Sequence, residues 1–305
     1  MGQIHLVSEL TYNVFGLNIR SPLEIPDLMP VNEGSVDVDI RFGKNPVKLG
    51  NVRSSGILYE ATENEFLLKL PRIGSYHVVN GNQVTIEAKS GITDDEIRLF
   101  LTGSVFGAIL YQRGYLPIHG SSVEIKGYAL LILGNSASGK STLAAALNRE
   151  GFPLISDDLS AISMNDTGEC AVLPGLPFVK LWEDTRQPLF GNISFRRVRP
   201  QIKKFIIPAD SYAVKPCRIR KLIRLTTKNT EGFLIHSVQG AIKLKLLREN
   251  LYRDQLISGT GLPGHHFTML SSLANQTEMY HVERPSVPLD IDPLIKLVLK
   301  EIIGR

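Results

Sequence analysis

Cysteine is scarce in this chain of 305 residues, and so are long hydrophobic runs. Two cysteines, Cys170 and Cys217, are too few for a disulfide framework or a cysteine-rich metal site. The longest apolar stretch, residues 100–111, is interrupted by glycines and is too short to span a bilayer. Residues 1–10 lack the basic start and the apolar core of a secretory signal peptide. We therefore expect a cytoplasmic protein with no membrane partner.

A strong excess of charge is also missing, since the net charge is only +4. The 43% of hydrophobic and 21% of charged residues are ordinary for a globular protein and argue against a disordered chain. Eleven basic residues and a single acid, Asp210, nevertheless lie between Arg196 and Lys228. This basic segment fits an anionic ligand, or a solvated face on which cations alternate along strands. Because it contains no recognisable RNA or DNA module, it does not favour a nucleic-acid partner.

The first hundred residues have the alternating hydrophobicity of β-strands. Residues 35–42 alternate strictly, and residues 56–70 predict a pair of strands. Residues 76–79 and 84–88 flank Asn80-Gly81-Asn82-Gln83, which predicts a hairpin. We expect a smaller, mostly β domain over residues 1–92 and a second domain over residues 93–305.

The sequence predicts a helix at each end of the second domain. Thr93-Asp94-Asp95-Glu96 is a capping box that predicts a helix ending near Gly114. Residues 293–303 predict an amphipathic terminal helix. In contrast, the glycines of residues 259–264 and the adjacent His265-His266 indicate a loop, and the neighbours Glu283 and Arg284 indicate a local ion pair.

A phosphate-binding motif follows the apolar run of residues 128–133. It matches G-x-x-x-x-G-K-[ST] at every fixed position and is followed by a good helix former, so strand, loop and helix come in the order that the motif requires. Backbone amides of such a loop form an anion nest, and the helix adds its positive dipole end. We predict that a nucleotide binds to Gly134, Asn135, Ser136, Ala137, Ser138, Gly139, Lys140, Ser141 and Thr142.

Individual residue types in this loop have separate tasks. The Lys140 ammonium neutralises phosphate oxygens, and the Ser141 hydroxyl is a ligand for Mg²⁺. Asp157 and Asp158 follow the short apolar strand of residues 152–156, only seventeen residues after Lys140. Because ligands lie beyond the carboxyl ends of parallel strands, both carboxylates are expected in the crevice of the phosphate loop. One suits Mg²⁺ and the other suits proton acceptance, and the sequence leaves open which does which.

Together with His119-Gly120, the loop and the aspartate pair resemble the HPr kinase/phosphorylase family. The short distance from the loop lysine to the acids carries most of this resemblance. Segments farther along resemble a divergent branch of the family that occurs beside modified-peptide biosynthesis genes: Pro174–Pro177, Lys180-Leu181-Trp182, Leu251-Tyr252-Arg253 and Val282–Pro285. Some members of that branch phosphorylate the C-terminal serine of lasso precursor peptides.

The resemblance implies an α/β fold, with a P-loop core like that of HPr kinase and phosphoenolpyruvate carboxykinase. It implies a kinase that uses Mg²⁺ and ATP or GTP, with a peptide carrying an acceptor serine as its partner. One of the two aspartates would be the general base, and His119 would lie near the transferred phosphate. Lys180 and Arg253 would contact phosphate or peptide.

Two other functions fit the same residues. One is HPr(Ser) kinase/phosphorylase itself, although the Glu-x-Arg-Gly signature expected after the aspartates is missing. The other is a nucleotide-dependent switch or scaffold without catalysis, which would need only a metal ligand and not a second carboxylate. Whether the chain forms a homo-oligomer is left open.

Overall fold

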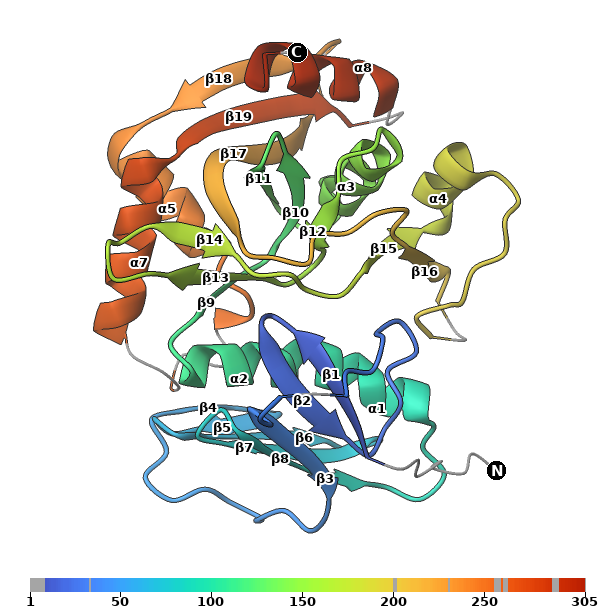
Figure 1. Ribbon diagram of the computed structural model, residues 1–305, viewed down its shortest axis with the longest axis vertical. Helices are drawn as coiled ribbons and strands as arrows, with labels where there is room; N and C mark the ends of the chain where they lie inside the picture. Colours follow the sequence, from blue (N-terminus) through green and yellow to red (C-terminus); the bar gives the residue numbers. More distant parts are fainter. Residues whose placement is uncertain are drawn as a thin grey trace. The chain divides into compact units, whose positions relative to one another are not determined.

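The computed structural model describes residues 9–32, 34–199, 202–229, 231–254, 259, 263–286 and 291–304. The chain forms two compact units, Met1–Pro117 with Tyr252–Phe267 and Ile118–Leu251 with Thr268–Arg305 (Figure 1). The sequence placed a division after residue 92, whereas the first unit continues to Pro117. The helical segment after residue 92 packs on the N-terminal sheet, since the Tyr76 hydroxyl donates to the carbonyl of Ile97 at 3.1 Å.

The first unit is a mostly β structure covered by one interrupted helix. Its sheet has the order β1-β2-β3-β8-β7-β6-β5-β4. The helical segment comprises α1 (Asp94–Phe100), a π-helical turn (Leu101–Val105) and α2 (Phe106–Gln112). The strands are β1 (Leu10–Val14), β2 (Leu17–Ser21), β3 (Val38–Phe42), β4 (Ser54–Gly56), β5 (Tyr59–Ala61), β6 (Glu65–Leu70), β7 (Gly74–Val79) and β8 (Gln83–Ala88).

Local sequence signals in this unit are confirmed. The hairpin β7–β8 turns at Asn80 and Gly81, whose φ angles of 51° and 64° are those that an Asn-Gly turn requires. Thr93 and Glu96 make both hydrogen bonds of the capping box. The strand expected from residue 35 begins at Val38 instead, where pairing with β2 starts.

The second unit is built on a mixed sheet. In it β11 (Tyr128–Leu133) lies between antiparallel β10 (Gly120–Ile125) and parallel β17 (Cys217–Lys228). The other strands are β9 (Leu116–Ile118), β12 (Leu154–Ser156), β13 (Ser160–Met164), β14 (Cys170–Val172), β18 (Leu234–Val238) and β19 (Glu278–Pro285), while β15 (Phe178–Trp182) and β16 (Lys204–Pro208) form a separate hairpin. Since β12 and β11 both run antiparallel to β10, their carboxyl ends lie at one edge.

Helices cover this sheet and complete its core. α3 (Lys140–Arg149) and α8 (Ile291–Leu297) bury apolar side chains against β10, β11 and β17, and α8 continues into a π-helical turn, Val298–Ile302. The hairpin β15–β16 and α4 (Glu183–Phe190) pack against α3 (Figure 1). The same unit also contains α5 (Gly240–Glu249). No described helix is long and apolar enough to cross a membrane.

Two expectations from the sequence are wrong. His265 and His266 lie in α7 (Pro263–Gln276), which begins at a proline whose fixed φ suits the first helical turn. Glu283 does not pair with its neighbour Arg284 but with Lys228 at 2.9 Å, because adjacent residues of β19 point to opposite faces of the sheet.

The basic segment is divided between two environments. On β17, Arg218 and Arg220 point to solvent, as expected for cations that alternate along a strand, and Arg218 pairs with Glu169. Lys204, on β16, instead lines a cavity that it shares with the phosphate loop.

Candidate active site

The phosphate-loop motif connects β11 to α3. Gly134 and Gly139 adopt φ angles of 145° and 103°, which side chains rarely allow. A Cβ at Gly134 would lie 2.2 Å from the carbonyl oxygen of Leu225 on β17. Glycine at the first motif position is therefore required by both conformation and space.

Lys140 is buried and points back into its own loop. Its ammonium donates to the carbonyl oxygens of Gly134 at 2.7 Å and Asn135 at 3.0 Å. Burial lowers the pKa of Lys140, and the negative charges of Asp157 and Asp158 oppose that shift. Lys140 and Asp158 line one cavity, so both can contact one ligand.

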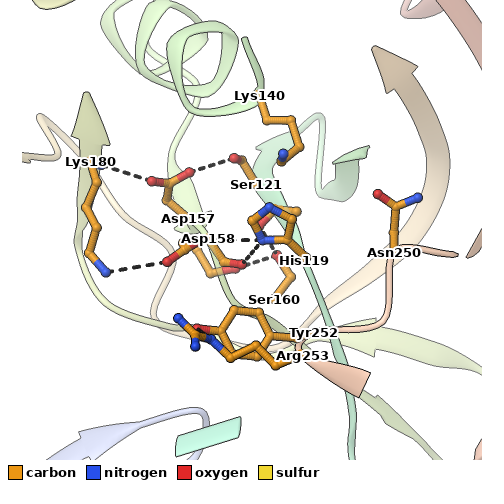
Figure 2. A network of polar contacts seen from close by, with 12 residues as sticks. His119, Ser121, Lys140, Asp157, Asp158, Ser160, Lys180, Asn250, Tyr252 and Arg253 are labelled. Carbon is orange, nitrogen blue, oxygen red and sulfur yellow. Dashed lines mark hydrogen bonds and ion pairs between the residues drawn. The ribbon is translucent and has the colours of Figure 1, made fainter. Parts of the chain in front are cut away.

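Asp157 is held from two sides. Its Oδ1 accepts a 2.6 Å hydrogen bond from the Ser121 hydroxyl on β10, and its Oδ2 accepts a 2.9 Å bond from the backbone amide of Lys180 on β15 (Figure 2). Only 8% of the residue is exposed. Asp157 therefore ties β12 to β10 and β15.

Asp158 is placed differently although it is the next residue. Its φ of 69° turns the chain, and its carboxylate lies 3.4 Å from His119 Nδ1 and 3.5 Å from Lys180 Nζ (Figure 2). Burial by itself raises the pKa of Asp158, but the hydrogen bond from His119 and the charge of Lys180 outweigh it and hold the pKa well below its usual value. Asp158 is therefore ionised at neutral pH.

One cavity of about 530 Å³ brings most of the predicted site residues together. Those that line it are His119, Ser136, Ala137, Gly139, Lys140, Ser141, Thr142, Asp158 and Lys180. The other predicted residues do not line it but hydrogen-bond to residues that do. The carbonyls of Gly134 and Asn135 accept from Lys140, the Ser138 carbonyl accepts from Arg284, and Asp157 Oδ2 accepts from the Lys180 amide. Arg253 belongs to the other compact unit, where its Nε donates to the Tyr252 hydroxyl at 3.2 Å.

Asn250 supports the site, although its role was not predicted from the sequence. Its Oδ1 accepts a 3.1 Å bond from the Gly134 amide, and its backbone carbonyl accepts a 2.7 Å bond from the His119 amide. It thereby couples the start of the phosphate loop to the histidine. Because Asn250 is separated from both partners by more than a hundred residues, no local sequence signal points to this role.

Arg284 is the second supporting residue that sequence reasoning missed. Only 5% of it is exposed, at the end of β19, and its Nε donates to the Ser138 carbonyl at 2.8 Å. Its other nitrogens donate to the carbonyls of Pro285 and Ala137. The guanidinium both fixes the loop backbone and adds a positive charge to the cavity wall.

Charge in the cavity favours a polyanionic ligand. Lys140, Lys180, Lys204 and Arg284 line it, against the carboxylates of Asp158 and Asp184. An enclosed excess of positive charge concentrates anions and suits a triphosphate. Its volume is in the range of small-molecule binding pockets.

The oxygen donors in this cavity fit Mg²⁺ bound together with phosphate. Ser141 and Asp158 line the cavity, while Asp157 accepts a hydrogen bond from the amide of Lys180, which also lines it. Mg²⁺ is usually held by one or two carboxylates, phosphate oxygens and water rather than by a cage of protein ligands. Among the described residues, no group of three or more His, Cys, Asp or Glu could hold a metal ion.

Comparisons with known proteins find distant similarity among solved structures only. No protein-family model matches the chain, and no curated protein is similar to it. Among solved structures, the Hpr(Ser) kinase/phosphatase from Coxiella burnetii is 16% identical, with a TM-score of 0.32, and the match covers 61% of this chain and 88% of that one.

Proposed function

We propose that this protein is a P-loop kinase that transfers the γ-phosphoryl group of ATP or GTP to a serine hydroxyl of a peptide. The observation that carries the proposal is that Asp158 lines the same cavity as Lys140, Ser141 and Thr142. A carboxylate, a loop lysine and a metal-ligating hydroxyl around one triphosphate-sized space are the parts that phosphoryl transfer needs.

In this proposal the loop binds and orients the donor. Loop amides and the N-terminus of α3 hold the phosphates, and Lys140 turns from the loop carbonyls to the phosphate oxygens. Ser141 and the phosphates would hold Mg²⁺, which would supply positive charge against the phosphate oxygens. Arg284 and Asn250 keep the loop in shape. Positioning and electrostatics supply most of the acceleration.

Asp158 is the residue to which we assign proton acceptance. As the bond between serine Oγ and the γ-phosphorus forms and the bond from that phosphorus to the bridging oxygen breaks, the hydroxyl proton passes to the Asp158 carboxylate. His119 and Lys180 orient this carboxylate. Both Asp157 oxygens are already hydrogen-bonded within the protein, so we assign Asp157 to positioning Ser121 and Lys180.

The acceptor that we propose is the C-terminal serine of a lasso precursor peptide. Support for it comes from the residues that resemble that branch of kinases, of which Lys180 and Trp182 line the cavity. In the same proposal the part of residues 93–305 that forms the second compact unit, Ile118–Leu251 with Thr268–Arg305, is the kinase domain, and residues 1–92 belong to an accessory domain.

The test is phosphoryl transfer from labelled ATP or GTP to a precursor peptide ending in serine, with purified HPr as a second acceptor. Asp158→Asn should lower turnover by about 10²- to 10⁴-fold, the usual contribution of a general base. Its affinity for ATP should stay near that of the wild type. Lys140→Ala should lose both transfer and nucleotide binding.

Each alternative gives a different result in this assay. Transfer to HPr but not to the peptide would identify an HPr kinase. Tight nucleotide binding without transfer to either acceptor would identify a switch or scaffold. Unchanged turnover in Asp158→Asn would contradict the assignment of the base.

A further inference from the structure

The wall opposite the phosphate loop is formed by the β15–β16 hairpin and α4. Successive side chains of β15 alternate between two environments, so that Val179 and Leu181 are buried in the core against α3. Lys180 and Trp182 share the other face. Lys180 reaches Asp158, and Trp182 lies two residues, about 7 Å, farther along the strand.

Trp182 presents an exposed aromatic surface inside this cavity. The residue is 47% exposed although it lines the same space as the phosphate loop. Lys204, its cross-strand partner on β16, places Nζ 5.7 Å from the centre of the indole ring, a cation–π distance. The Trp182 carbonyl accepts a hydrogen bond from Thr185 in the first turn of α4, so the backbone at this position is fixed.

Residues beyond Trp182 make this part of the cavity partly apolar. Pro188, Leu189 and Ile291 line it, together with the polar groups of Asp184 and Thr185. A flat ring with polar edges fits an aromatic face, an apolar wall and a few hydrogen-bonding groups. A phosphate group bound in this part of the cavity would make no use of the aromatic surface of Trp182.

We infer that Trp182 is the platform on which the base of the nucleotide stacks. This inference rests on the proposed function and assigns the base end of the donor. The reactive end is fixed at Asp158, which contacts both His119 and Lys180. Thr142, on the first turn of α3, lines the same cavity as Trp182, so a nucleotide held at the start of α3 can extend to this wall.

A peptide side chain is the competing occupant of Trp182. The acceptor serine must reach Asp158, whereas Trp182 lies farther along β15, on the side of α4. One continuous cavity joins Trp182 to Ser141 and Thr142 of the loop. We therefore assign Trp182 to the donor nucleotide, and a peptide side chain at Trp182 is an outcome that the experiment distinguishes.

Trp182 is the single tryptophan of the chain, so the tryptophan fluorescence of the protein comes from this site alone. ATP with Mg²⁺ should change the fluorescence of the wild-type protein, while inorganic triphosphate, which lacks a base, should change it far less. By calorimetry, Trp182→Ala should bind ATP about tenfold more weakly, in line with the contribution of one base–aromatic stack. Its affinity for triphosphate should be unchanged. Trp182→Phe, which keeps a ring, should stay within about threefold of the wild type for ATP.

The controls separate this inference from the proposed function. Thermal unfolding of Trp182→Ala should resemble that of the wild type, because the side chain is half exposed. Equal ATP affinity in wild type and Trp182→Ala, with normal phosphoryl transfer, would overturn the base platform and leave the kinase intact. A raised KM for the acceptor peptide with unchanged ATP affinity would also overturn it and assign Trp182 to the acceptor. If the wild type bound neither ATP nor triphosphate, the kinase proposal would fail, and the base platform with it.

Discussion

The two walls of the cavity are built in different ways. The loop wall, residues 134–142, presents backbone amides and glycines with positive φ, and its shape depends on contacts with Leu225, Asn250 and Arg284. The opposite wall presents the side chains of Lys180, Trp182 and Lys204 from a two-stranded hairpin.

Because the two walls are built differently, they suit different parts of the ligands. Backbone groups can bind only what all nucleoside triphosphates share, namely the phosphate chain. Side chains on the hairpin can be exchanged without altering the backbone and can therefore select the base or the acceptor. Substitutions in the loop wall should consequently damage both stability and binding, whereas substitutions in the hairpin wall should alter kinetic parameters with little loss of stability.

The largest effect is expected for Gly134→Ala. The added methyl would lie 2.2 Å from the Leu225 carbonyl at a φ of 145°, so the loop or β17 must move. We expect the free energy of unfolding to fall by about 2–5 kcal/mol and ATP binding to be lost. Urea unfolding and calorimetry measure both quantities.

Gly151→Ala is the matched control for this change. Gly151 also has a positive φ, 89°, but a Cβ there would have nothing within 4 Å. It should cost about 1 kcal/mol and leave ATP binding intact. Equal losses in the two variants would show that conformation alone, and not the approach to β17, makes Gly134 necessary.

Arg284→Met should have the next largest effect. It removes hydrogen bonds to the carbonyls of Ala137 and Ser138, which we expect to cost about 1–3 kcal/mol of stability and to lower turnover more than tenfold. Arg284→Lys should recover part of the activity, since it keeps the charge but not the planar fork.

The exposed Arg218→Met serves as the control for Arg284. Arg218 pairs with Glu169 on the surface, so its loss should cost less than about 1 kcal/mol and leave turnover unchanged. If Arg284→Met transferred phosphate at the wild-type rate, the loop wall would not depend on β19.

Structural features that depend on a few consecutive residues could be predicted from the sequence. The hairpin at Asn80-Gly81, the capping box at Thr93 and the strand–loop–helix around Lys140 all follow from local chemistry, and all three are present. His265 and His266 show the limit of this reasoning, because preceding glycines suggested a loop where Pro263 begins a helix.

Features that depend on long-range packing could not be predicted. Arg284 contacts Ser138 across 146 positions, and Asn250 contacts Gly134 across 116. The sequence also could not distinguish Asp157 from Asp158. Their difference arises from the positive φ of Asp158 and from Ser121 and Lys180, which tertiary structure brings to Asp157.

The smallest of these effects is expected for Lys180→Met, which should shift the pH dependence of turnover. It is also the most direct test of the role of the hairpin wall. Lys180 Nζ lies 3.5 Å from Asp158 and helps to keep the pKa of that carboxylate low. Removing the positive charge should raise the pKa of Asp158. Because proton acceptance requires the ionised carboxylate, the loss of turnover on acidification should then begin at a higher pH than in the wild type.

A lysine that precedes β16 and does not line the cavity provides the comparison for Lys180. Lys203 is mostly exposed and pairs with Glu183, so Lys203→Met should leave the acid limb of the pH–rate profile where it is in the wild type. Stability should change little in either variant, because each removes one ion pair without opening the core. An acid limb that stayed in place in Lys180→Met would mean that His119 alone keeps Asp158 ionised. The hairpin wall would then contribute to binding but not to the chemistry of the base.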